Sequence, residues 1–111
     1  MDNENLSALI MELRRGTLVL CALCKLKKPM YGYSLVSELN EDGIPVEGNT
    51  LYPLLRRLES QGLLESRWDT GESKPRKYYA VTQEGERVRE ALLKNWREMN
   101  ISMKKITGED L

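Results

Sequence analysis

The chain has 111 residues, with 17 basic and 17 acidic side chains and no histidine. This length fits one domain, and a composition of 41% apolar and 31% charged residues indicates a compact, helix-rich protein rather than a disordered one. The zero formal net charge excludes a uniformly basic nucleic-acid binder, so any contact with DNA must come from local patches. We recognise neither a signal peptide nor an apolar run near the roughly 20 residues that span a bilayer, and therefore expect a cytoplasmic protein without a membrane partner.

The two cysteines, Cys21 and Cys24, form a C-x-x-C pair. A zinc site would need two more soft ligands from the chain, so we expect neither a metal nor a cofactor, unless two subunits pool their cysteines or the pair is redox-active. Because the segment 17–27 is apolar almost all round, we favour a packing role for both in a buried helix. A catalytic cysteine needs an activating neighbour, and Lys25 points to another helical face, so we expect no catalytic residue and no enzyme.

Apolar spacing predicts three helices in the first half of the chain. The first has one apolar face made of Leu6, Leu9, Ile10 and Leu13. Gly16 is expected to bend or break this first helix before the apolar segment 17–27. The second helix is predicted from about 33 to 40. The next helix should start between residues 49 and 52, because Pro53 has no backbone N–H and fits only the first turn. Gly62 is expected to cap its end.

After Gly62 the periodicity changes. Residues 63–68 and 76–81 are rich in strand formers and enclose turn residues at 69–75, which predicts a hairpin. Thr82 is expected to cap a long last helix over 83–106. Apolar side chains spaced by four, four, three, four and three residues give this helix a seam that is typical of helix pairing: Val88, Leu92, Trp96, Met99, Met103 and Ile106.

The helix that begins near residue 49 has two different faces on a helical wheel. Leu51, Leu54, Leu55 and Leu58 lie on one side, and Asn49, Pro53, Arg56 and Ser60 lie on the other. Tyr52 and Arg57 lie on the flanks. Polar and cationic groups near a helix start suit a phosphate backbone and a groove floor, and the following hairpin carries Lys74, Arg76 and Lys77. The pattern predicts a winged helix-turn-helix whose third helix enters the major groove of DNA.

A different interpretation starts from the charges. Residues 31–81 carry six basic and eight acidic side chains. Each cationic patch alone is more often a solvated surface than a site, so the winged helix could be the scaffold of a protein-interaction module. The polar outer face of the third helix and the basic hairpin favour DNA, for which we expect modest non-specific affinity.

Four segments, in order and at the right separations, resemble the PadR family of bacterial transcriptional regulators. They are RRGTLVL at 14–20, YGYSLVSEL at 31–39, NTLYPLLRRLESQGLLESRW at 49–68 and KPRKYYAVTQEG at 74–85. The resemblance implies a mainly α (α+β) fold. A winged helix-turn-helix with an N-terminal helix would occupy 1–81, and a C-terminal dimerisation helix with a short tail would occupy 82–111.

The resemblance also implies a homodimeric repressor that binds an inverted-repeat operator in double-stranded DNA, one winged helix on each half. By position, the family's DNA-facing residues fall on Tyr31, Asn49, Thr50, Tyr52, Pro53, Arg56, Lys74, Arg76 and Lys77. Tyr31 could equally be a packing residue. In the short subgroup that this chain resembles, the last helix pairs across the dimer. The seam and the apolar face at 6–13 would then form the dimer interface.

Some short family members hold flat aromatic compounds between their two subunits, near a tryptophan of the last helix. Trp96 is at the matching place, and Met99 lies one turn further along. The two could line an adaptable apolar pocket for a small aromatic effector. Packing within the dimer is the alternative, and the position of Trp96 in the seam favours it. No effector is assigned on these grounds.

Overall fold

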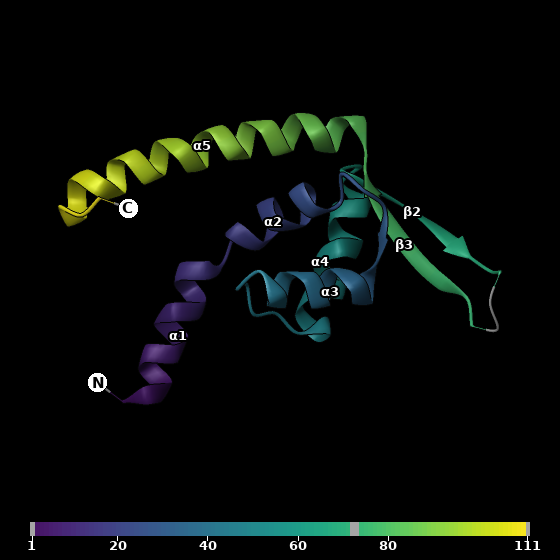
Figure 1. Cartoon of the computed structure of the whole chain (residues 1–111), viewed down its shortest axis with the longest axis horizontal. Helices are drawn as coiled ribbons and strands as arrows, with labels where there is room; N and C mark the ends of the chain where they lie inside the picture. The colour runs from purple at the N-terminus through teal and green to yellow at the C-terminus, as the bar shows by residue number, and fades with distance from the viewer. Residues whose placement is uncertain (1, 72–73, 111) are drawn as a thin grey trace.

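The computed structural model describes residues 2–71 and 74–110, over which it has five α-helices and one three-stranded antiparallel sheet (Figure 1). In chain order the elements are α1 (Asn3–Arg14), α2 (Thr17–Lys25), β1 (Met30–Tyr31), α3 (Gly32–Glu41), α4 (Gly48–Ser60), β2 (Leu64–Asp69), β3 (Arg76–Val81) and α5 (Gln83–Thr107). Three core helices followed by a hairpin form a winged helix-turn-helix, which confirms the predicted fold.

The core lies between α2, α3, α4 and the sheet. Leu23 of α2, Leu35 of α3 and Leu55 of α4 are fully buried there. The predicted inner face of α4 is confirmed, because Leu51, Leu55 and Leu58 are buried and Leu54 is half-buried. Burying one leucine side chain stabilises a fold by about 2 kcal/mol, so this group holds the three helices together.

The sheet has the order β1–β3–β2, with the second strand of the hairpin in the middle. β1 pairs Met30 with Tyr79 and Tyr31 with Tyr78. The sequence pattern does not indicate this strand, because two residues show no periodicity and their hydrogen-bond partners lie far along the chain. The predicted hairpin is confirmed, but residues 72 and 73 of its turn lie outside the described residues.

The boundaries of α4 correct one prediction and confirm another. α4 begins at Gly48, before the predicted window, so Pro53 lies in the second turn rather than in the first. The proline is tolerated there because the carbonyl that loses its helical donor belongs to the exposed Asn49, where water can satisfy it. Gly62 ends the helix as predicted: its φ is 78°, and its N–H donates to the Glu59 carbonyl over 3.0 Å.

α1 and α5 project from the winged helix toward the same side (Figure 1). Gly16, with a φ of 89°, separates α1 from α2, and all residues of α1 are exposed. The radius of gyration of the Cα atoms is 16.1 Å, whereas a compact chain of this length has about 13 Å. None of the helices over the described residues combines the length and the apolar composition needed to cross a membrane.

Thr82 connects the hairpin to α5. Its backbone N–H donates to the Leu63 carbonyl over 3.0 Å, and its hydroxyl donates to the Gly62 carbonyl over 2.7 Å. The same hydroxyl accepts the N–H of Gly85 over 2.9 Å, which confirms Thr82 as the predicted cap. One residue thus ties together the end of α4, the start of β2 and the start of α5.

Cys21 and Cys24 lie on α2 as free, half-buried thiols. Burial raises the pKa of the Cys21 thiol, and the nearby Cys24 raises it further. A thiol that stays protonated at neutral pH is a poor nucleophile, which fits the predicted packing role.

Candidate nucleic-acid interface

The outer face of α4 carries the side chains predicted to meet DNA. Asn49, Thr50, Pro53 and Arg56 are all exposed. They lie along the first three turns of the helix, and the N–H groups of Thr50 and Leu51 in its first turn donate to the Glu47 carbonyl. The face therefore offers hydrogen-bond donors, acceptors and one cation over about two turns. Side chains of these kinds can pair with base edges in a DNA groove.

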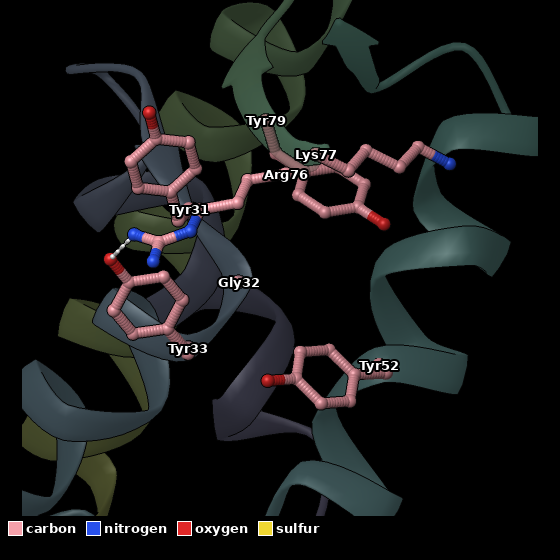
Figure 2. A pocket seen from close by; sticks show the side chains of 7 residues that line it. All are labelled: Tyr31, Gly32, Tyr33, Tyr52, Arg76, Lys77 and Tyr79. Carbon is pink, nitrogen blue, oxygen red and sulfur yellow. Dashed lines mark hydrogen bonds between the residues drawn. The ribbon is translucent and has the colours of Figure 1, made fainter. Parts of the chain in front are cut away.

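Tyr52 is half-buried and joins α3 to α4. A Cβ atom at Gly32 would lie 2.6 Å from its ring, and one at Gly48 would lie 2.8 Å from it. The ring thus fits between two helix starts that only glycine allows to come so near. Figure 2 shows its hydroxyl pointing away from α4. The ring has a packing role, and the hydroxyl is the part that can meet a ligand.

Tyr31, Tyr33 and Arg76 form an aromatic and cationic cluster beside the wing. The two tyrosine rings stack with centroids 5.6 Å apart and planes 7° from parallel. The Arg76 guanidinium lies 5.8 Å from the Tyr31 centroid and 5.3 Å from that of Tyr33, and its Nη1 donates to the Tyr33 hydroxyl over 2.8 Å. Tyr33 is not among the predicted site residues, although its place two residues after Tyr31 at a helix start is a usable signal.

Asp69 anchors this cluster to the hairpin. The Tyr31 hydroxyl donates to the Asp69 carboxylate over 2.5 Å. This hydrogen bond, followed by the Gly71 N–H and the charge of Arg76, lowers the pKa of the Asp69 carboxyl. The Tyr31 hydroxyl therefore has a partner within the chain, as expected if Tyr31 is a packing residue. Its contact with DNA stays a prediction.

Lys77 connects the wing to α4. Its ammonium lies 3.3 Å from a carboxylate oxygen of Glu59 and 5.3 Å from the ring centroid of Tyr79. Glu59 also accepts a hydrogen bond from the Ser66 hydroxyl. That bond first, and Lys77 second, lower the pKa of the Glu59 carboxyl. Lys74, in contrast, is exposed near the tip of the wing. The three predicted wing cations therefore differ: two are fixed by neighbours, and one extends into solvent.

The acidic residues near the interface are partly neutralised. The Lys25 ammonium lies 2.5 Å from Asp42 and 3.1 Å from Glu38. These carboxylates, Asp42 first, raise the pKa of Lys25. The excess of acid counted over residues 31–81 ignores this cation from α2. It therefore overstates the repulsion that DNA would meet.

An open cavity of about 220 Å³ lies between β3 and the starts of α3 and α4 (Figure 2). It is lined by Tyr31, Gly32, Tyr33, Tyr52, Arg76, Lys77 and Tyr79. In Figure 2 Arg76 extends toward Tyr31 and Tyr33 and Lys77 extends toward α4, so the charged ends of these two side chains point in opposite directions. Its lining contains no carboxylate among the described residues.

The predicted dimer interface divides into two groups. Val88 and Leu92 pack against the chain's own core near α2. The others are exposed: Leu6, Leu9, Ile10, Leu13, Trp96, Met99, Met103 and Ile106. Of the twelve exposed large apolar side chains among the described residues, ten lie on α1 or on the second half of α5. Such a concentration of exposed apolar surface is typical of an interaction face.

Comparison with known proteins identifies the family of this chain. Residues 19–91 match the Transcriptional regulator PadR-like family. The chain belongs to the PadR-like family. A PadR family transcriptional regulator from Eggerthella lenta has the same fold with a TM-score of 0.89 and 51% identity, covering 97% of this chain and 96% of that one. The membership of the PadR family that the four sequence segments indicated is therefore confirmed.

Three further relatives share less sequence identity with this chain. A PadR-like transcription factor from Bacteroides fragilis is 35% identical, with a TM-score of 0.74 over 89% of this chain and 98% of that one. A transcriptional regulator of Mycobacterium tuberculosis is 34% identical over 79 residues, which are 71% of each chain. Bacillus subtilis PadR, solved in complex with operator DNA, shares the fold with a TM-score of 0.66 at 24% identity, over 71% of this chain and 46% of that one.

Proposed function

We propose that this PadR-like regulator is a homodimeric repressor that binds an inverted-repeat operator sequence-specifically. The observation that carries the proposal is the exposed polar face of α4 beside a wing with basic side chains. In this proposal residues 1–81 bind DNA and residues 82–111 form the dimerisation part. The protein acts where bacterial DNA lies, in the cytoplasm.

In the proposed complex α4 enters the major groove. Asn49 and Arg56 have side chains that can pair with base edges, whereas Thr50 and Pro53 contact the backbone or the groove wall. Lys74 reaches a neighbouring phosphate from the wing. The Bacillus subtilis PadR complex with operator DNA supports this arrangement at the level of a shared fold.

A second copy of the chain is the partner that we propose for the apolar faces of α1 and α5. Exposure of Leu13 and Ile106, at 75% and 78%, supports this because such side chains on a lone chain promote aggregation. Helices α1 and α5 both project to one side of the winged helix (Figure 1), so we propose that one partner covers the apolar side chains of both. Two winged helices related by a two-fold axis match an inverted repeat.

Trp96 and Met99 have two candidate roles in this dimer. Trp96 is 45% exposed in the single chain and Met99 63%, which is compatible with packing in the interface and with a wall of a pocket for a planar aromatic effector. A fluorescence titration with a panel of planar aromatic compounds distinguishes them, with Trp68→Phe used to remove the second tryptophan signal. Saturable quenching supports the pocket, and unchanged emission supports packing.

Footprinting on the DNA upstream of the protein's own gene tests the main proposal. We expect the purified protein to protect an inverted repeat. Arg56→Ala should weaken this binding by about tenfold or more, because a bidentate contact to a base is worth about 1–3 kcal/mol. Arg87→Ala removes the same charge from an exposed site on α5 and serves as the matched control.

Two results would contradict the proposal. Equal effects of Arg56→Ala and Arg87→Ala would mean that α4 does not read the groove. Absence of protection on that DNA and on a library of random duplexes would favour the alternative function, in which the winged helix is a scaffold and the faces of α1 and α5 bind another protein.

A further inference from the structure

Cys21 and Cys24 lie on consecutive turns of α2, within a helix of nine residues. Packing accounts for only one of them. Cys21 contacts the core, whereas Cys24 is not among the side chains that pack against it. Both thiols are free and half-buried, and Cys24 is near enough to Cys21 to raise the pKa of its thiol. α2 therefore carries two neighbouring thiols that a small reagent can reach.

The neighbours of α2 hold its helical spacing in place. On one side the helix buries Ala22 and Leu23 in the core. On the side of α5, Arg89 lies beside Cys24. The Arg89 side chain is 13% exposed, and its Nε and Nη2 donate to the two carboxylate oxygens of Glu86 over 2.9 and 3.0 Å. Since α2 is enclosed between the core and α5, the distance between its two thiol-bearing positions cannot change freely.

This spacing is unfavourable for a disulfide. Residues three apart on a helix have Cβ atoms about 5–6 Å apart, whereas the Cβ atoms of a disulfide are about 3.5–4.5 Å apart. A disulfide between Cys21 and Cys24 would therefore have to distort α2. The raised pKa of Cys21 also keeps its thiol protonated, which slows attack on an oxidised sulfur. A single atom inserted between the two sulfurs would span the longer gap without this distortion.

The number of ligands indicates which kind of atom fits. A closed zinc site has four ligands, and residues 2–71 and 74–110 contain no group of three or more His, Cys, Asp and Glu side chains that could hold a metal ion. Trivalent arsenic with one organic substituent needs only two further bonds, and it prefers sulfur. We propose that Cys21 and Cys24 form a dithiol site that binds an organic trivalent arsenical, with arsenic bridging the two sulfurs. This inference is independent of DNA binding.

The bond changes balance without an oxidant or a reductant. With phenylarsine oxide as the reagent, two arsenic–sulfur bonds form, while the two sulfur–hydrogen bonds and the bonding between arsenic and its oxygen break. Both protons leave with this oxygen as one water molecule. Arsenic stays trivalent and the sulfurs are not oxidised. The reaction consumes protonated thiols, so the protonated state of Cys21 does not prevent it.

A titration of the full chain with phenylarsine oxide tests the inference, after reduction by a phosphine that contributes no thiol. The mass of the intact protein and the number of free thiols are measured together. We expect one phenylarsenic group per chain and the loss of both free thiols. An excess of a monothiol should leave the adduct in place, and a small dithiol should remove it, because only the dithiol can replace both bonds at once.

Two single variants and one matched control locate the site. Cys21→Ser and Cys24→Ser should each bind phenylarsine oxide at least about a hundredfold more weakly, because the second arsenic–sulfur bond is lost. The control combines Cys21→Ser with Ser7→Cys, which keeps two thiols in the chain but moves one to the exposed face of α1. It should bind as weakly as the single variants.

The melting temperature shows whether the folded chain provides the site. A ligand that prefers the folded state stabilises it, so phenylarsine oxide should raise the melting temperature of the wild type and leave that of Cys24→Ser unchanged. An unchanged or lower melting temperature of the wild-type adduct would mean that the unfolded chain binds at least as well, which would overturn the inference.

Three further results would overturn it. One is a wild type that keeps both free thiols at a saturating concentration of phenylarsine oxide, a result that does not depend on any variant. The second is tight binding by the control with separated thiols. The third is zinc binding that protects both thiols from the reagent, which would replace the dithiol site with a metal site shared between two subunits.

Discussion

Leu55 of α4 is fully buried, whereas Leu13 of α1 is 75% exposed, although both lie on the apolar face of an amphipathic helix. The same contrast separates two regions of the molecule. The winged helix covers its leucines with three helices and a sheet, while α1 and the second half of α5 leave theirs open. The first region has its partners within the chain, and for the second we propose the surface of another chain. Stability should therefore depend on the chain alone in the first region and on protein concentration in the second.

Among the substitutions considered, one in the core is expected to have the largest effect on the free energy of unfolding. Leu55→Ala should lower the free energy of unfolding by about 3 kcal/mol, because it removes buried methyl groups and leaves a cavity. Urea unfolding at two protein concentrations measures this loss, which should be the same at both. A loss that changes with concentration would mean that the winged helix is not stable without its partner.

A charge placed among the exposed apolar side chains of α5 should weaken the association of two chains. Met99→Glu is expected to weaken the proposed dimer by about thirtyfold, roughly 2 kcal/mol, because its interface would have to bury a carboxylate. Ile101→Glu is the matched control, since Ile101 is 56% exposed and lies about 200° away around the same helix. Light scattering over a dilution series gives both values. Equal effects of the two variants would place the interface elsewhere.

Gly32→Ala tests the packing of Tyr52 at the edge of the core. Alanine usually stabilises a helix relative to glycine by about 1 kcal/mol, but here its Cβ would lie 2.6 Å from the Tyr52 ring. We expect a net destabilisation of about 1–2 kcal/mol, measured by thermal unfolding. In the background of Tyr52→Ala the same change should be neutral or stabilising. Additive losses in the double variant would exclude the ring as the cause.

The smallest effect concerns the carboxylate that joins α4 to the wing. The pKa of Glu59 is lowered in the folded chain from an ordinary value of 4.5. Its stabilising contribution is therefore complete above that ordinary value and is lost as the pH falls through the lower folded pKa. Glu59→Gln should reduce stability by under about 1 kcal/mol at neutral pH, with a difference that disappears in acid. Glu65→Gln on the same hairpin is the control, and a difference that persists in acid would contradict the ionic origin.

The sequence predicted those parts of the fold that local rules determine. Helical spacing identified the buried face of α4, and Thr82 and Gly62 marked helix ends because their chemistry acts on adjacent residues. β1 was missed, since its two residues become a strand only by pairing with β3. The start of α4 was placed too late, because the rule for Pro53 assumed that its missing hydrogen bond would be costly, and the exposed Asn49 carbonyl makes it tolerable.

The candidate site was predicted less completely than the fold. The outer residues of α4 followed from the helical wheel. The roles of Lys77 and Tyr33 did not, because each depends on a neighbour from another element: Glu59 pairs with the first, and Arg76 binds the second. Such pairs form only when α3, α4 and the hairpin have packed. A count of charges along the chain cannot reveal which cations are already engaged.

The single residue between β3 and α5 has a mechanical consequence. Thr82 bonds to Gly62, Leu63 and Gly85, so the base of the wing and the first turn of α5 move as one body. α5 has 25 residues and is therefore about 37 Å long. A tilt of this body by about 10° displaces the far end of α5 by roughly 6 Å for this length. In the proposed dimer, a change in how the two copies of α5 cross would alter the distance between the two wings, and with it the spacing of the DNA sites that the pair could span.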